Sequence, residues 1–375
     1  MPGLSPYVVQ ELEQENFKVI ETAVTSVTTE GNLDDTVHLN LILRSASKVL
    51  YGIRSVPCST MDDLYNILKE IPWELYFTNE SYFSIESTSN QEQVKNTMFL
   101  NQKAKDAVVD RFMKLYDSRP NSGPDKNFLL IHIRWHSDQL DVYIDTSGQT
   151  ISKHNYRTNP YKAPLLEALA SSVIMASKWD HGTPLVIPMC GSGTLAIEAV
   201  LMAIHSFPGT KRDNFSFMHL KEFNRDEFEK TNSKIRSRMV SDPILQVYAS
   251  DISKEAIDIS KENAKNAEVD HLIKFEVANF QNCFIPSQPG TIIFNPPYGD
   301  RLHELETIED SYKDIGDFLK KECEGYTGYV FTANLGAAKS IGLRTSSKKQ
   351  FFNGAKEARL LEFQMYKGSM KQTKD

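Results

Sequence analysis

The chain of 375 residues is longer than a typical single domain, so we expect two or three domains. Apolar residues make up 40% and charged residues 24%, as in an ordinary globular protein, and no run of about 18 uncharged apolar residues suggests a membrane-spanning helix. The net charge of −7 does not by itself indicate nucleic-acid binding, which depends on local clusters of Lys and Arg.

The N-terminus lacks the basic region of a signal peptide and soon becomes acidic. The cysteines lie far apart and follow no metal-binding spacing with one another or with histidine; they are Cys58, Cys190, Cys283 and Cys323. We therefore expect a cytoplasmic protein with reduced thiols, no bound metal and no membrane partner.

Up to about residue 150, the pattern mixes helices with antiparallel strands. Residues 19–43 contain β-branched runs around a turn at Gly31 and Asn32, which predicts an antiparallel unit. Apolar spacing then predicts a helix, a strand, a second helix and a hairpin, over residues 62–70, 82–86, 101–116 and 128–145. This order is typical of an α+β arrangement.

After about residue 160, short apolar strands alternate with helices. The strands are predicted at residues 185–189, 245–251, 273–279, 291–295 and 328–334. Such alternation predicts βαβ units and a largely parallel, doubly wound sheet. Residues 349–352 and 358–366 predict a C-terminal antiparallel hairpin, followed by a frayed tail. Residues 206–239 form a charged insertion with no obvious place in the sheet.

The first chemical motif is Gly191-Ser192-Gly193, between a strand and an apolar helix. Glycines there permit a tight turn and allow a ligand to approach the helix N-terminus closely. The sequence has neither the full GxGxxG pattern, because Ala196 stands at its third glycine, nor a phosphate-binding GxxxxGK[ST] loop. The loop suits a cofactor with a sulfonium and a ribose, and a plain strand–helix turn is the alternative.

Polar residues end the next two strands. Asp251 stands where a carboxylate accepts hydrogen bonds from ribose hydroxyls, although it could instead cap the next helix, for which Ser253 is the better candidate. Asn279 could offer its amide to an adenine amine, and Phe280 could place its ring beside the base. Core packing of Phe280 is the alternative.

The most specific motif is Asn295-Pro296-Pro297-Tyr298, at the end of the fourth strand. An exocyclic amine on an aromatic ring is a poor nucleophile because its lone pair is delocalised. The side-chain oxygen of Asn295 and the carbonyl of Pro296 can accept its two N–H groups, and the prolines make the loop rigid. Tyr298 can stack on the target base, worth about 1–3 kcal/mol. A proline-rich turn is the alternative for the proline pair alone.

The octapeptide NPPYGDRL, residues 295–302, resembles motif IV of the guanosine-N2 RNA methyltransferases of bacteria and archaea that carry a THUMP domain. Four further stretches are similar to segments of that family: residues 1–12, 151–170, 206–217 and 341–366. The resemblance covers nearly the whole chain and is stronger after residue 150.

The resemblance implies three domains: a ferredoxin-like unit over residues 1–57, a THUMP-like RNA-binding domain over residues 58–150, and a Rossmann-like class I methyltransferase domain with a seven-stranded sheet over residues 151–366. The sequence itself predicts that residues 367–375 form a disordered tail. It implies S-adenosyl-L-methionine as cofactor, bound by Cys190, Gly191, Ser192, Gly193, Thr194, Asp251, Ile252, Asn279 and Phe280. It also implies an amine site formed by Asn295, Pro296, Pro297 and Tyr298. The expected product is N2-methylguanosine in RNA, with large-subunit ribosomal RNA the first expectation and transfer RNA the second.

The sequence departs from the family pattern in three places. Ile187 stands where the family usually has Asp, and Asn279 replaces an acidic residue. The basic and glycine positions before Tyr156 hold Ser152, His154 and Asn155. These departures leave open a non-catalytic RNA-binding or assembly factor with a decayed site. Adenine-N6 methylation of DNA and glutamine-N5 methylation of protein are further alternatives, because NPPY-type loops serve amine methylation generally.

Basic residues gather in two stretches of the sequence. We expect both stretches to line the path of the RNA, with solvated surface charge as the alternative for each residue. They are Arg301, Arg344, Lys348, Lys349, Lys356 and Arg359 towards the C-terminus, and Lys211, Arg212 and Arg225 in the insertion.

Overall fold

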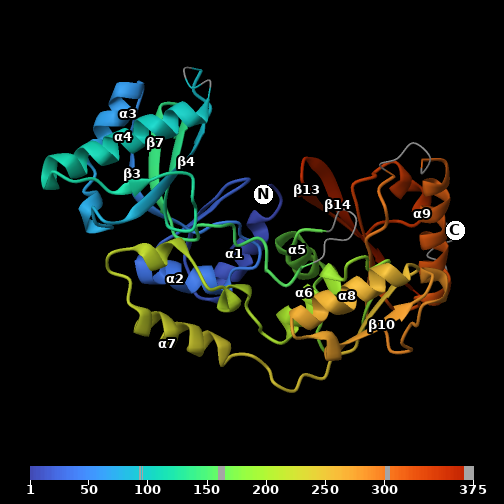
Figure 1. Ribbon diagram of the computed structural model, residues 1–375. Coiled ribbons are helices and arrows are strands. Elements are labelled where there is room, and N and C mark those ends of the chain that lie inside the picture. Colours follow the sequence, from blue (N-terminus) through green and yellow to red (C-terminus); the bar gives the residue numbers. More distant parts are fainter. Residues whose placement is uncertain (93, 95, 159–164, 300–304, 367–375) are drawn as a thin grey trace. The chain divides into compact units, whose positions relative to one another are not determined.

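The computed structural model describes residues 1–92, 94, 96–158, 165–299 and 305–366. The chain divides into two compact units, each built from separated segments (Figure 1). The first unit comprises Met1–Thr29, Ser152–Phe207 and Arg238–Asp375, and the second comprises Glu30–Ile151 and Pro208–Ser237. The domain boundaries expected from sequence stay a prediction. No helix in these described ranges is long and apolar enough to cross a membrane.

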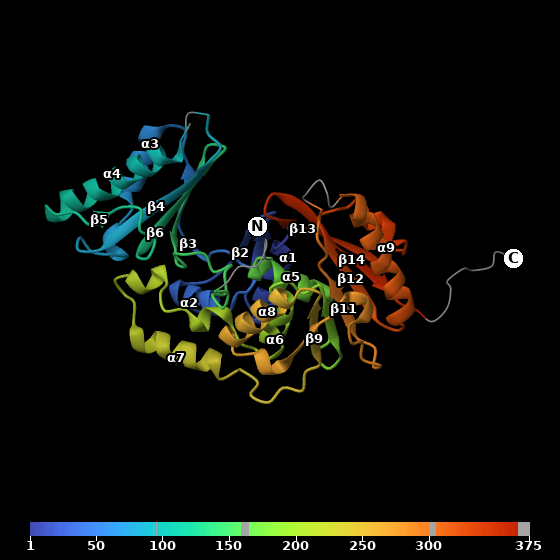
Figure 2. The ribbon, with the colours of Figure 1, turned by 45° about the vertical axis from the view of Figure 1, so that its right-hand side comes forward.

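Seven strands in the described part of the first unit form one sheet in the order β10-β9-β8-β11-β12-β14-β13. Figure 2 labels β9, β11, β12, β13 and β14 of this sheet. The first five are parallel neighbours, and β14 runs antiparallel to both β12 and β13. This confirms the expected doubly wound sheet with a C-terminal hairpin. The bounds are β8 Leu185–Pro188, β9 Val247–Asp251, β10 Ile273–Val277, β11 Thr291–Phe294, β12 Thr327–Thr332, β13 Ser347–Asn353 and β14 Lys356–Gln364.

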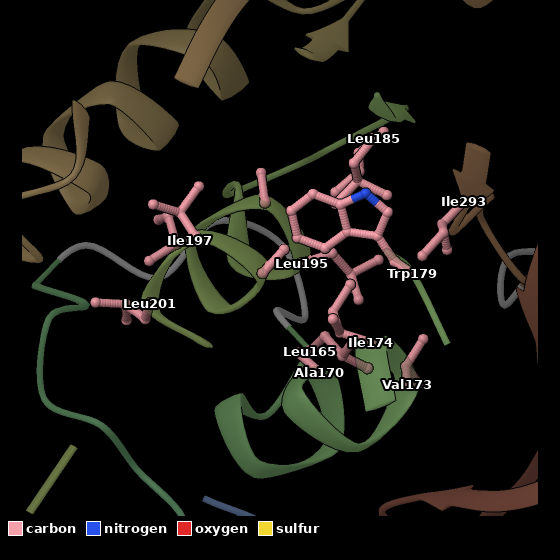
Figure 3. Close-up of a cluster of buried hydrophobic side chains, with 14 of the residues drawn as sticks. Leu165, Ala170, Val173, Ile174, Trp179, Leu185, Leu195, Ile197, Leu201 and Ile293 are labelled. Atoms are coloured by element: carbon pink, nitrogen blue, oxygen red, sulfur yellow. The ribbon is translucent and has the colours of Figure 1, made fainter. Parts of the chain in front are cut away.

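Helices cover both faces of this sheet because its strands are apolar on both sides. On one face α5 (Glu167–Ser177), α6 (Thr194–Ala203) and α8 (Lys254–Asn266) enclose a core that includes Trp179 and Leu195 (Figure 3). On the other face α9 (Leu305–Glu322) and the short helix η7 (Ala337–Ile341) enclose a second core. The helices α5 and α6 are buried almost throughout, which explains their apolar sequences.

The N-terminal segment of the first unit packs on the edge of this sheet. Leu4, next to α1 (Ser5–Gln14), joins the core around α5, and Tyr7 stacks on Phe351 of the edge strand β13 with ring centroids 5.4 Å apart. The short helices η4 (Asp270–Leu272) and η5 (Phe280–Asn282) precede and follow β10. The first unit therefore contains sequence from both ends of the chain.

The prediction of an antiparallel unit over residues 19–43 is wrong for the second half of that range. The strands β1 (Val19–Thr22) and β2 (Val27–Thr29) pair antiparallel, but α2 (Leu33–Ile42) follows them. Asn32 and Asp35 form a capping box, in which each side chain accepts the other's backbone N–H at 3.0 and 2.8 Å. This cap favours a helix despite the apolar run that follows.

The second unit is an α+β structure, as expected. Five strands in its described residues form a sheet in the order β3-β7-β6-β4-β5, and α3 and α4 pack on it around Trp73, Phe77 and Phe112. The expected hairpin is present as β6–β7. The bounds are β3 Leu50–Pro57, α3 Met61–Glu70, η1 Trp73–Leu75, β4 Tyr82–Ser89, α4 Thr97–Tyr116, β5 Asn121–Ser122, β6 Leu129–His136 and β7 Gln139–Asp145.

The insertion with no predicted place belongs to the second unit. It forms η2 (Pro208–Lys211), η3 (Ser216–His219) and α7 (Arg225–Arg236). Ser216 Oγ accepts the backbone N–H of Leu130 at 2.9 Å, so the insertion binds directly to the start of β6. At Gly209 a Cβ would lie 2.2 Å from the carbonyl oxygen of Asn40, so only glycine permits this approach to α2.

Candidate active site

The loop after β8 turns through two glycines with left-handed backbone. Gly191 has φ +56° and Gly193 has φ +79°. A Cβ at Gly193 would lie 3.0 Å from Ser260 Cβ of α8, so the loop and that helix are in close contact. Within the described residues no side chain caps α6. Its first N–H groups therefore point out of the helix toward the strand ends, as in sites that bind anionic ligand groups.

Two polar residues of α8 hold the carbonyls of this loop. Ser260 Oγ donates to the Gly191 carbonyl at 2.6 Å, and Asn263 Nδ2 donates to the Ser192 carbonyl at 3.1 Å. Sequence reasoning missed both. Their signal was a pair of polar residues three positions apart on the buried face of α8.

Asp251 joins the ends of β8 and β9. Its carboxylate accepts the Gly191 N–H at 3.0 Å through Oδ2 and the Ser253 N–H at 2.9 Å through Oδ1. Each carboxylate oxygen retains a second lone pair, which a ribose hydroxyl can use. The next residue, Ile252, is 72% exposed and presents an apolar surface beside the carboxylate. Ser253 caps α8, as the sequence favoured.

Asn279 and Phe280 follow β10. Asn279 Oδ1 accepts the Gln281 N–H at 3.0 Å and so caps η5. The Phe280 ring is 8% exposed and makes edge-to-face contacts with Phe294 and Phe318, with centroids 5.8 and 5.7 Å away. The ring therefore packs mainly in the core under α9, and its place beside a base stays a prediction.

The Asn295–Tyr298 loop follows β11. Tyr298 Oη donates to Asn295 Oδ1 at 3.2 Å, and Asn334 Nδ2 donates to the Tyr298 carbonyl at 3.0 Å. Pro296 is buried, whereas Asn295 and Tyr298 are half-buried. Because β8, β9, β10 and β11 are parallel, all four motif loops leave the same edge of the sheet. Strand order reverses at β8, and ligands bind at such switch points.

Cys190 lies in the first loop, where its surroundings disfavour the reactive thiolate. Burial, with a smaller contribution from the charge of Asp251, raises the pKa of Cys190 to about 12. A neutral thiol is a weak nucleophile, so a packing or cofactor-contact role for this residue stays the prediction. The part of the motif that continues after Gly299, including Arg301, lies outside the described residues.

Three of the residues that depart from the family pattern lie in well-defined surroundings in the first unit. Ile187 is fully buried in the core of the first unit. Asn155 has φ +65°, a conformation that glycine adopts most easily and asparagine next, so it can replace a glycine there. His154 Nδ1 lies 2.8 Å from Glu198 Oε1, which is also buried, so this position is part of an internal polar pair.

Arg157 follows this segment and reaches the same loop. Its guanidinium donates to Thr194 Oγ1 at 3.0 Å and to the Leu165 carbonyl at 2.7 Å, and lies 3.8 Å from the Glu167 carboxylate. Thr194 is the first residue of α6. The sequence pointed to no role for this arginine, whose contact with Thr194 depends on the fold.

The basic residues expected along the RNA path differ in their surroundings. In the first unit Arg344, Lys348 and Lys356 are exposed, whereas Lys349 donates to the Ala176 carbonyl and Arg359 pairs with its neighbour Glu357. In the second unit Lys211 and Arg225 are exposed, whereas Arg212 donates to the carbonyls of Gln149 and Thr150. An RNA path along these residues stays a prediction.

Three family models match the chain. Residues 154–361 match a model described as RMKL-like, methyltransferase domain, residues 58–145 match the THUMP domain, and residues 1–50 match the RlmL ferredoxin-like domain. The chain is 33% identical, over 97% of its length, to ribosomal RNA large subunit methyltransferase K/L of Psychromonas ingrahamii, but spans only 49% of that protein. It is 29% identical to slr0064 of Synechocystis sp., named provisionally as an RNA methyltransferase, with 97% and 95% of the two chains covered.

Solved structures give the same fold. A methylase candidate from Clostridium difficile 630 is 27% identical, with a TM-score of 0.90 over 99% of this chain and 97% of that one. A Listeria monocytogenes protein named provisionally as an N6-adenine-specific DNA methylase is 25% identical, with a TM-score of 0.88 and coverage of 97% and 94%. A further protein, solved with SAH and named provisionally as a methyltransferase, shares the fold at 24% identity, with a TM-score of 0.90 over 98% and 97% of the chains.

Proposed function

The chain belongs to the RMKL-like methyltransferase family, and on that premise we propose that it transfers a methyl group from S-adenosylmethionine to the N2 amine of a guanosine in RNA. The observation that carries the proposal is the placement of the Asn295–Tyr298 loop. It leaves the same sheet edge as the glycine loop and Asp251, so a cofactor and a flat amine can meet there.

The residues at this edge fit the proposed cofactor. Asp251 can accept ribose hydroxyls, the exposed Ile252 can contact the adenine face, and Asn279 can bind its polar edge. A Cβ built on Gly191 would have no heavy atom within 4 Å in the described structure, which leaves room for a ligand at the loop. Residues 190–194 would hold the amino-acid part near the α6 N-terminus. Bound there, the cofactor supplies an electrophilic methyl group on sulfur.

The protein's own part in the reaction is to orient the amine. Asn295 Oδ1 and the Pro296 carbonyl accept its two N–H groups, which directs the nitrogen lone pair toward the methyl group. Pro296 and Pro297 fix the backbone of the loop, so these acceptors are in place before the target arrives. The Tyr298 ring stacks on the base. A base that is stacked and paired in a nucleic-acid duplex cannot reach this loop, so extruded or unpaired nucleotides are the expected targets.

Large-subunit ribosomal RNA is the proposed substrate, with transfer RNA second. The name of the Psychromonas relative supports the first, and the matches to the THUMP and RlmL ferredoxin-like models support RNA in general. A second candidate is adenine-N6 methylation of DNA, favoured by the provisional name of the Listeria structure and by the same amine chemistry at Asn295.

Nucleoside mass spectrometry tests the proposal. RNA and DNA from cells lacking the protein are compared with those from cells supplied with the wild type, Asn295→Ala or the control Asn353→Ala, which changes an asparagine at the β13–β14 turn. We expect N2-methylguanosine to fall in large-subunit RNA and to return with the wild type and the control alone.

Each other outcome contradicts the proposal in a distinct way. Loss from transfer RNA would shift the substrate, and loss of N6-methyladenine from DNA would establish the second candidate. Full activity of Asn295→Ala would show that Asn295 does not form the amine site. Unchanged nucleosides, together with no calorimetric binding of S-adenosylhomocysteine, would indicate a decayed enzyme.

A further inference from the structure

Asn334 lies two residues beyond β12 and outside the Asn-Pro-Pro-Tyr motif, yet it holds that motif's loop. Its Nδ2 donates to the Tyr298 carbonyl at 3.0 Å, while its Oδ1 accepts the Ala337 N–H at 2.9 Å. Its own N–H donates to Thr332 Oγ1 at 2.9 Å. Because β11 and β12 are parallel neighbours, their carboxyl ends are adjacent, and one side chain can join the two loops.

A second side chain supports the same loop from α9. The hydroxyl of Tyr312 hydrogen-bonds to Thr332 Oγ1 at 2.6 Å and donates to the Pro297 carbonyl at 3.4 Å. Tyr312 and Thr332 are fully buried. The carbonyls of Pro297 and Tyr298 are thus both held by groups from neighbouring elements, and the backbone of the loop is fixed from outside the motif.

The fixed backbone matters because the Tyr298 side chain contacts the proposed amine acceptor. Its hydroxyl donates to Asn295 Oδ1 at 3.2 Å. A hydroxyl donor selects the oxygen rather than the amide nitrogen of Asn295, and so determines which way that amide faces. Oδ1 keeps a second lone pair for an N–H of the target.

We propose that Asn334 is a positioning residue that acts through Tyr298: it holds the Tyr298 backbone so that the hydroxyl keeps the Asn295 amide turned with its oxygen toward the target amine. The inference rests on the proposed function of Asn295. Tyr298 then has two roles: its ring stacks on the base, and its hydroxyl orients the Asn295 amide. The second role depends on Asn334, which lies in the loop after β12.

A double-mutant cycle tests the proposal. Asn334→Asp keeps an oxygen for the Ala337 N–H but removes the donor to Tyr298, and Tyr298→Phe keeps the ring but removes the hydroxyl. The substrate is large-subunit RNA from cells lacking the protein, with labelled S-adenosylmethionine. We expect each variant to lower kcat about tenfold, with S-adenosylhomocysteine affinity within about twofold, and the double variant to lower it about tenfold as well.

An independent structural role for Asn334 would give a different result. The two losses would then multiply to about a hundredfold in the double variant, which would overturn the proposal. Full activity of Asn334→Asp would overturn it as well. Methyl transfer by the wild type is a separate requirement, and its absence would reject the proposed function itself.

Amide hydrogen exchange tests the hydrogen bond from Asn334 to Tyr298 without any measurement of activity. In the Asn334→Asp variant, exchange at Tyr298 and Gly299 is expected to become at least about fivefold faster while exchange in β12 stays unchanged. Equal acceleration throughout β12, or no acceleration at Tyr298, would show that Asn334 does not hold this loop.

Discussion

Replacement of Gly193 by alanine tests whether the glycine loop and α8 form one rigid cofactor cradle. Gly193 has φ +79°, and an added Cβ would lie 3.0 Å from Ser260 Cβ and 3.1 Å from Ser260 Oγ. Ser260 cannot move aside at no cost, because its hydroxyl holds the Gly191 carbonyl at 2.6 Å. The substitution therefore strains the loop and weakens its attachment to α8 together.

Two contributions set the expected magnitude. A left-handed conformation costs alanine about 1–2 kcal/mol. The crowding against Ser260 adds about 1–2 kcal/mol, the lower range for overpacking of a close-packed site. The matched control is Gly354→Ala in the β13–β14 turn, where φ is +64° and a Cβ meets no heavy atom within 4 Å in the described structure. Only the conformational cost applies there.

Urea unfolding and calorimetry with S-adenosylhomocysteine measure the two effects. Gly193→Ala is expected to lower the free energy of unfolding by about 2–4 kcal/mol and Gly354→Ala by about 1–2 kcal/mol. Affinity for S-adenosylhomocysteine is expected to fall at least about tenfold in the first variant and to stay unchanged in the second. If the two variants lost equal stability and both bound the ligand as the wild type does, the glycine loop and α8 would not form a rigid cofactor cradle.

Three further substitutions examine individual groups. Asp251→Asn exchanges a charged acceptor of two backbone N–H groups for a neutral one, so calorimetry should show at least about tenfold weaker S-adenosylhomocysteine binding, with the exposed Asp258→Asn as an unaffected control. Arg157→Ala should weaken binding of S-adenosylhomocysteine but not of 5′-methylthioadenosine, which lacks the amino-acid part; equal losses would assign the arginine a structural role alone. Burial raises the pKa of Glu86, but hydrogen bonds and ion pairs with Lys126 and Lys48 outweigh it and bring that pKa to about 2. Its contribution to stability is therefore complete above about pH 4.5 and lost toward pH 2, and Glu86→Gln should flatten acid unfolding over that range.

The strand-end motifs could be read from the sequence because their chemistry is local. Each functional stretch directly follows a short apolar strand, and parallel strands bring those ends together without any further information. The direct hydrogen bond between Gly191 and Asp251 is the consequence of that rule in this chain. The roles of individual side chains were harder to predict, and Phe280 illustrates why, since its ring packs against Phe294 and Phe318.

Features that depend on long-range contacts could not be predicted. The insertion joins the second unit through contacts such as that of Ser216 with Leu130, 86 residues apart in the chain. Nothing in the insertion's own pattern indicates this partner. The helix α2 was not predicted for a different reason: the apolar run after Asn32 resembles a strand, and the helix depends on its capping residues.

The departure at Ile187 bears on whether the cofactor site is active or decayed. Ile187 is fully buried, so a carboxylate at that position would need a partner inside the core. In this chain the glycine loop is held from the β9 side instead, by Asp251 and by the polar residues Ser260 and Asn263. A loop whose carbonyls and N–H groups are fixed by three side chains has not lost its support. This support is intact in the described structure, as the proposed function requires.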